Sequence, residues 1–272
     1  MATFTTSDGL SLHYTDDGAG LPLLCLAGLT RTGRDFDYVR PLLPPARVIT
    51  LDYRGRGMSD WDPNPMNYVP EVEGRDVLEL LDHLGVPAAA ILGTSRGGLL
   101  AMGLAATVPD RLLGVCLNDV GPEIDPAGIA AIMAYLGKNP PMQTHEQMAA
   151  AMQMGLPGFV NVPETRWLQE ARTQYRIGPD GLEITYDPGL RAPIEAGGDV
   201  PDLWPLFDAL AGKPLALIRG AGSNLLRVET ATKMQARRPD MIFAEVPDRG
   251  HVPFLDEPEA LAAIREWMEM MT

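Results

Sequence analysis

The sequence of 272 residues has little that would place the protein outside the cell or in a membrane. It contains two cysteines, Cys25 and Cys116, and both fall in short apolar runs, so we expect buried packing thiols and no disulfide. The first residues have neither the basic start nor the apolar core of a signal peptide. No run approaches the ~18 apolar residues of a membrane span. We therefore expect a cytoplasmic protein.

Positive charge is also scarce. Lys and Arg total 22 against 36 Asp and Glu, giving a formal net charge of −14, which argues against nucleic acid and anionic membranes as partners. With 46% apolar and 21% charged residues, the chain has the composition of a globular protein. Its length suits one α/β domain with an insertion, and we expect a small-molecule partner.

The most informative motif is the segment 93–97, which reads Gly-Thr-Ser-Arg-Gly and fits G-x-S-x-G. An apolar run at 88–92 precedes it and predicts a buried strand. A stretch rich in small residues at 98–106 follows and predicts a helix that ends before Pro109. A strand, a sharp turn and a helix are the context in which such a serine is a nucleophile, so we assign that role to Ser95.

A serine nucleophile needs a base, and His251 is the histidine best placed to serve. It lies in a turn-rich loop after the predicted strand 241–246, from which it can reach the carboxyl-terminal edge of a parallel sheet. For His13, His83 and His145 we expect surface or packing roles.

These features resemble the α/β-hydrolase superfamily, in particular bacterial serine esterases with a helical cap. The resemblance places the acid of the triad in the turn 221–226, where related sequences read Ser-Asp-Leu-Leu and this chain has Asn224. An amide orients the histidine poorly and does not offset the charge of the imidazolium. We therefore favour a triad weakened by Asn224, whether that residue is natural or engineered.

The alternative acid is Asp119. It ends the predicted strand 115–119, and some members of the superfamily take their acid from this position. The run Asn-Asp-Val-Gly-Pro at 118–122 equally suits a turn that leads into the cap.

The resemblance also assigns an oxyanion hole to the backbone N–H groups of Leu29 and Arg96. Most relatives have His-Gly where this chain has Ala27 and Gly28, so the match of this loop is partial. The segment 51–60 resembles the D-x-R-G-x-G-x-S motif of the superfamily. In it we expect Asp52 and Arg54 to hold the loop in place and to have no catalytic role.

Strand and helix patterns alternate along the chain up to residue 121 and again after residue 207. An opening hairpin at 3–6 and 10–15 is followed by strands at 22–27 and 47–52 and by helices within 34–43 and 69–84. We thus predict an α/β-hydrolase core, with a mostly parallel sheet flanked by helices, from residues 1–121 and 208–272. Residues 122–207 carry helical patterns and form the expected cap. Its apolar side chains, among them Met133, Met152 and Trp204, are expected to bind substrate.

These patterns together predict a serine hydrolase of carboxylic esters or lactones that forms an acyl-enzyme and needs neither metal nor cofactor. A serine at position 95 argues against haloalkane dehalogenases and epoxide hydrolases, which belong to the same superfamily but have an aspartate as the nucleophile at this turn. Carbon–carbon bond hydrolases and thioesterases keep the serine and stay open as alternatives. A second class of function, a small-molecule receptor with little turnover, is suggested by Asn224.

Overall fold

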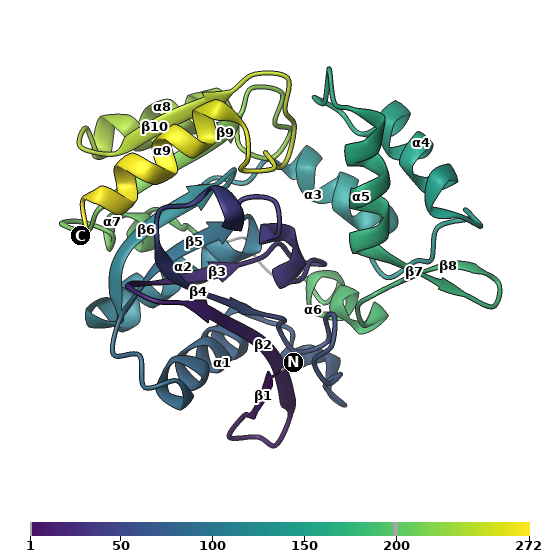
Figure 1. Cartoon of the computed structure of the whole chain (residues 1–272), viewed down its shortest axis with the longest axis horizontal. Coiled ribbons are helices and arrows are strands. Elements are labelled where there is room, and N and C mark those ends of the chain that lie inside the picture. The colour runs from purple at the N-terminus through teal and green to yellow at the C-terminus, as the bar shows by residue number, and fades with distance from the viewer. Residues whose placement is uncertain (1, 198–200) are drawn as a thin grey trace.

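The computed structural model describes residues 2–197 and 201–272. In this part of the chain, eight strands form one sheet in the order β1-β2-β4-β3-β5-β6-β9-β10, which is parallel from β4 onward (Figure 1). The opening hairpin is antiparallel, as predicted. The strands are β1 (Ala2–Thr5), β2 (Ser11–Gly18), β3 (Leu21–Leu26), β4 (Ala46–Leu51), β5 (Ala89–Thr94), β6 (Leu112–Asn118), β9 (Leu215–Gly220) and β10 (Ile242–Val246).

Helices cover both faces of this sheet. One face packs against α1 (Pro70–His83), α2 (Arg96–Thr107), α7 (Trp204–Asp208) and α8 (Val228–Arg237), and the other against α9 (Pro258–Glu269). The prediction of a helix within 34–43 is wrong. The chain instead forms two short 3-10 turns, Gly33–Phe36 and Arg40–Leu42, because Pro41 and the nearby Pro44 and Pro45 prevent a continuous helix.

A mainly helical insertion separates β6 from α7, and Figure 1 shows its helices beside the sheet. It contains α3 (Pro126–Tyr135), α4 (His145–Gly155), α5 (Glu164–Gln174), the hairpin β7 (Tyr175–Gly178) and β8 (Gly181–Ile184), and α6 (Ala192–Glu195). The predicted cap also included residues 198–200, which lie outside the described residues, and the start of α7. Phe207 of α7 is fully buried in the core beneath α2, so we assign this helix to the core.

The loop after β4 is held as expected. Asp52 accepts hydrogen bonds from the backbone N–H groups of Gly33 (2.9 Å) and Met58 (3.2 Å). Arg54 is fully buried and pairs with Asp76 (2.6 Å) and Asp62 (2.5 Å). Both residues therefore fix the backbone near the carboxyl-terminal edge of the sheet.

The two cysteines are buried in the sheet, Cys25 on β3 and Cys116 on β6, and both are free thiols, as predicted. Burial raises the pKa of the Cys25 thiol to about 12. Across the described ranges, no helix combines the length and the apolar character needed to span a membrane.

Candidate active site

Ser95 stands at the sharp turn between β5 and α2. Its φ of 50° lies in a region that residues other than glycine seldom adopt, as expected of a strained nucleophile turn. The flanking glycines are required by close packing. A Cβ on Gly97 would lie 2.1 Å from the carbonyl oxygen of Leu26, and one on Gly93 would lie 2.6 Å from the backbone of Gly97. The two glycines therefore allow the turn between β5 and α2 to pack closely against β3, and this turn presents Ser95 at the edge of the sheet.

His251 reaches Ser95 from the loop after β10. Its Nε2 lies 3.0 Å from Oγ of Ser95, within the range for proton transfer from serine to a general base. Its Nδ1 lies 2.7 Å from Oδ2 of Asp119. The three side chains thus form a continuous serine–histidine–carboxylate chain.

Asp119 follows β6, the strand between β5 and β9, and its side chain is fully buried. Besides His251, the carboxylate accepts hydrogen bonds from the hydroxyl of Ser223 (2.6 Å) and the backbone N–H of Gly220 (2.9 Å). Two fixed donors hold the carboxylate in position and compensate its burial.

This arrangement corrects our preference for Asn224 as the group at the acid position. Asn224 lies in the bend after β9, and its side chain has no hydrogen bond to any described residue. The hydroxyl of the preceding Ser223 turns to Asp119 and also accepts from the N–H groups of Leu225 (3.2 Å) and Leu226 (3.1 Å). Because a carboxylate already occupies Nδ1 of His251, the geometry does not support a weakened triad.

The loop after β3 lies beside the nucleophile even though it lacks the usual histidine. The carbonyl of Ala27 accepts from the N–H of Gly97 (3.1 Å) and from the hydroxyl of Tyr53 (3.2 Å), and that of Leu29 accepts from Nε of Arg56 (2.8 Å). The backbone N–H groups of Leu29 and Arg96 donate to no residue that the structure describes. Both amides are therefore available to an oxyanion.

The side chain of Arg96 is held in a network of ion pairs. Its Nε pairs with Oε2 of Glu73 at 2.7 Å, and Glu73 in turn pairs with Nη1 of Arg56 at 2.6 Å. The carboxyl of Glu73 is fully buried, and the two guanidinium groups hold its pKa below the usual range despite the cost of burial. This network anchors the first turn of α2.

A cavity of about 310 Å³ opens above Ser95 and His251. Its walls come from the inserted helices, among them Ile132 and Tyr135 of α3, Met148 and Met152 of α4, and Trp167 of α5. This volume is at the small end of the range for ligand pockets.

Met152 lines this cavity, but Met133 and Trp204, which we also expected to bind substrate, do not. Met133 lies on another face of α3 and packs toward the buried cluster around Leu136. Trp204 belongs to α7, where its Nε1 donates to Glu123 at 3.1 Å. Sequence analysis missed Arg31 and Glu170, two charged residues that also line the cavity.

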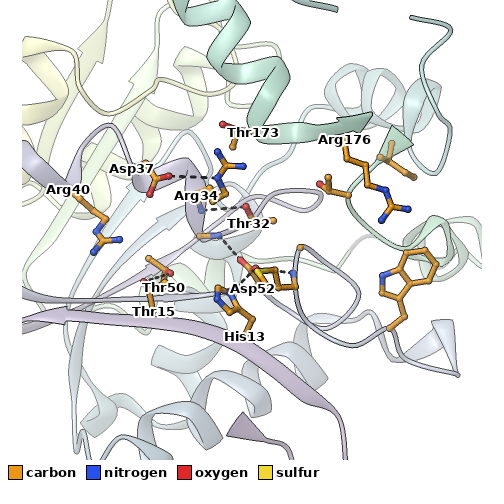
Figure 2. A pocket seen from close by; sticks show the side chains of 16 residues that line it. His13, Thr15, Thr32, Arg34, Asp37, Arg40, Thr50, Asp52, Thr173 and Arg176 are labelled. Carbon is orange, nitrogen blue, oxygen red and sulfur yellow. Dashed lines mark hydrogen bonds and ion pairs between the residues drawn. The ribbon is translucent and has the colours of Figure 1, made fainter. Parts of the chain in front are cut away.

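A second cavity of about 310 Å³ lies between the core and the β7–β8 hairpin. Figure 2 shows His13 beside Asp52 and Thr15 beside Thr50 along it, with Arg176 on the opposite side. His13 Nδ1 lies 3.1 Å from Asp52, but neither serine nor cysteine lines this cavity. Within the described residues, no group of three or more metal-binding side chains occurs.

Comparison with known proteins identifies the family. Residues 23–264 match the model of the alpha/beta hydrolase family, and the chain belongs to that family. It is 38% identical over 252 residues to the 3-hydroxybutyrate-oligomer hydrolase of Cupriavidus necator, covering 88% of this chain and 85% of that protein.

Two solved structures extend this result. An alpha/beta hydrolase from Novosphingobium aromaticivorans is 40% identical, with a TM-score of 0.91 over 98% of this chain and 97% of the other. A thermophilic esterase from Thermogutta terrifontis is 25% identical, with a TM-score of 0.74 over 99% and 98% of the two chains. The protein is thus a hydrolase of the alpha/beta family with ester-hydrolysing relatives.

Proposed function

We propose that this protein hydrolyses carboxylic esters of small, largely apolar substrates through an acyl-enzyme formed on Ser95. The observation that carries the proposal is the continuous chain from Ser95 through His251 to Asp119. His251 accepts the proton of Ser95 as the hydroxyl attacks the ester carbonyl, and it then returns the proton to the leaving alcohol. Asp119 orients the imidazole and stabilises its charged form.

In this mechanism the oxyanion is held by the N–H groups of Leu29 and Arg96. Loss of one such donor costs about 10² to 10³ in kcat in other enzymes. The amino-terminal end of α2 adds a favourable electrostatic potential at the same point. Water then attacks the acyl-enzyme, with His251 as general base, and releases the acid.

The names of two relatives support an ester bond as the bond that is cleaved. The protein from Cupriavidus necator is named for hydrolysis of 3-hydroxybutyrate oligomers, and the one from Thermogutta terrifontis is named an esterase. The receptor hypothesis depended on Asn224 at the acid position. With the carboxylate of Asp119 2.7 Å from His251, that argument no longer applies.

The test is hydrolysis of 4-nitrophenyl butyrate and of the butyryl thioester of a matched thiol by the parent, by Ser95→Ala and by Ser7→Ala, a change at an exposed serine. We expect turnover of the ester, labelling of Ser95 by a fluorophosphonate, and a loss of about 10⁴ to 10⁶ in kcat for Ser95→Ala alone. Ester turnover by Ser95→Ala at the parent's rate contradicts the proposal. Faster turnover of the thioester than of the ester indicates a thioesterase.

A further inference from the structure

A charged cluster interrupts the apolar wall of the cavity above Ser95. Nη2 of Arg31 lies 2.6 Å from Oε2 of Glu170, and Nε of Arg31 lies 2.7 Å from Oδ2 of Asp35. The side chains of Glu170 and Asp35 are only 5% and 11% exposed, whereas that of Arg31 is 22% exposed. Arg31 and Glu170 line the cavity, so the cluster faces the space available to a substrate.

The cluster stands close to the reacting atoms. Arg31 ends the segment 27–31 that supplies the N–H of Leu29, and its side chain starts beside the nucleophile. A Cβ built on Gly28 would lie 3.3 Å from Cγ of Arg31 and 3.9 Å from Cβ of Ser95. Arg31 and Ser95 therefore both lie beside Gly28, and both line the cavity into which the acyl chain of an ester at Ser95 would extend.

Hydrogen-bonding capacity is left over on both members of the pair that line the cavity. A guanidinium has five N–H donors, and Nη1 of Arg31 has no acceptor among the described residues. Oε2 of Glu170 accepts from Arg31 and from Nε2 of Gln174 (3.1 Å), which uses part of the capacity of a carboxylate. A ligand that donates to Glu170 and accepts from Arg31 would satisfy both.

A hydroxyl group has this character, because it donates one hydrogen bond and accepts others. A substrate carboxylate fits less well. Arg31 already faces two carboxyl groups, so a third would meet like charge. A plain alkyl chain would displace water from Arg31 and Glu170 and leave their polar atoms without hydrogen bonds. Because unpaired buried polar groups cost free energy, such a site binds an analogue without the hydroxyl less well.

We infer that Arg31 and Glu170 bind a hydroxyl group on the acyl chain of the substrate, so that the cavity selects hydroxyacyl esters over plain acyl esters and over esters of dicarboxylic acids. This inference rests on the proposed ester hydrolysis at Ser95. It assigns specificity to residues that take no part in the triad.

The test compares kcat/KM for the 4-nitrophenyl esters of 3-hydroxybutyrate, butyrate and succinate (the hemiester), which differ mainly in the acyl substituent. Hydrogen bonds to charged groups predict that the parent prefers 3-hydroxybutyrate to butyrate by about 10-fold to 100-fold. The double variant Arg31→Gln/Asp35→Asn removes one positive and one negative charge and so keeps the formal charge of the cluster. It should lower that preference by about 10-fold.

The matched control is Arg172→Gln, which removes an arginine of α5, the helix that carries Glu170. Arg172 is 57% exposed, lies 3.6 Å from Glu146 and does not line the cavity, so the preference should not change. If the double variant fails to fold by circular dichroism, Arg31→Lys serves in its place. It keeps the charge, but a single ammonium replaces the planar guanidinium, and the preference should again fall.

Three kinetic results would overturn the inference: no preference for the hydroxyl in the parent, an unchanged preference in the Arg31 variants, or fastest turnover of the hemisuccinate. Failure of the proposed function is recognised separately, by the absence of ester turnover and of fluorophosphonate labelling. Calorimetry on Ser95→Ala with methyl 3-hydroxybutyrate and methyl butyrate then tests the hydroxyl preference as binding alone. Equal affinities for the two esters contradict the inference.

Discussion

Nδ1 of His251 lies 2.7 Å from Oδ2 of Asp119, although 132 positions separate the two residues in the chain. They meet because Asp119 follows β6 and His251 follows β10, and the carboxyl ends of these parallel strands lie at one edge of the sheet. Asp119 takes up a φ of 56°, an uncommon value for aspartate, which turns the chain directly after the strand. The position of the Asp119 carboxylate therefore depends on the path of β6.

We expect Asp119→Asn to lower kcat by about 10⁴, the loss that a comparable change causes in a serine protease. Asn224→Asp should leave kcat unchanged or lower it, because a second negative charge near His251 adds nothing to a carboxylate already in place. Initial rates on one ester, with active sites counted by burst titration, give both values. A rise of orders of magnitude in Asn224→Asp would instead restore Asn224 to the acid position.

The sequence was sufficient to predict the elements that carry strong local patterns. The apolar runs of the inner strands predicted the sheet, and the helical pattern within 69–84 predicted α1. Ser95 and His251 could be proposed from the sequence because a glycine-flanked serine and a loop histidine have recognisable neighbours, and the structure places the two side chains 3.0 Å apart. The distance between them could not be obtained from sequence, since it depends on how the strands are ordered.

The features that sequence analysis did not resolve depend on how residues far apart in the chain are arranged in the fold. Asp119 follows β6 in a run that equally suits a turn, and only its contact with Nδ1 of His251 distinguishes the two roles. On α3, Ile132 and Tyr135 face the cavity whereas Met133 does not, and a weakly amphipathic helix gives no sign of which side faces substrate. Trp204 belongs to a helix of five residues, too short to show a period.

We expect Ser223 to act as a positioning residue, because its hydroxyl donates to Asp119 at 2.6 Å. Ser223→Ala should lower kcat by about 10-fold, the loss expected for one hydrogen bond to a charged group, with little change in KM. Ser223→Thr keeps the hydroxyl and should recover most of the rate. Equal losses in both variants would show that the turn itself, and not the hydrogen bond, is responsible.

The apolar wall of the cavity should control chain length. Met148 is half-buried and lines the cavity, so Met148→Ala should shift the optimum toward longer acyl chains at little cost in stability. Trp167 is only 2% exposed and its ring lies 5.4 Å from that of Phe159, so Trp167→Ala should cost about 3–5 kcal/mol of unfolding free energy. Rates on 4-nitrophenyl esters of two to ten carbons, together with urea unfolding, measure the two effects. An unchanged chain-length profile in Met148→Ala would contradict this role.

Asp35 should make the stability of the protein depend on pH in a direction opposite to that of an ordinary ion-paired carboxylate. Burial raises the pKa of Asp35 from 3.8 to about 6, even though Arg31 acts to lower it, and the buried Oδ1 has no hydrogen-bond partner within the described residues. Between these pH values the folded protein binds a proton that the unfolded chain has lost, so this contribution to stability declines as pH rises from about 4 to about 6.

Urea unfolding of the parent and of Asp35→Asn between pH 4 and pH 7 isolates this effect. Carboxyl groups whose pKa is lowered by ion pairs, such as Asp16 beside Arg47, are present in both proteins and cancel in the difference. The unfolding free energy of the parent minus that of the variant should decrease across the window and level off above pH 6. Because Asn carries no proton that titrates there, a difference that is constant with pH would show that Asp35 ionises in the folded protein as it does in the unfolded chain.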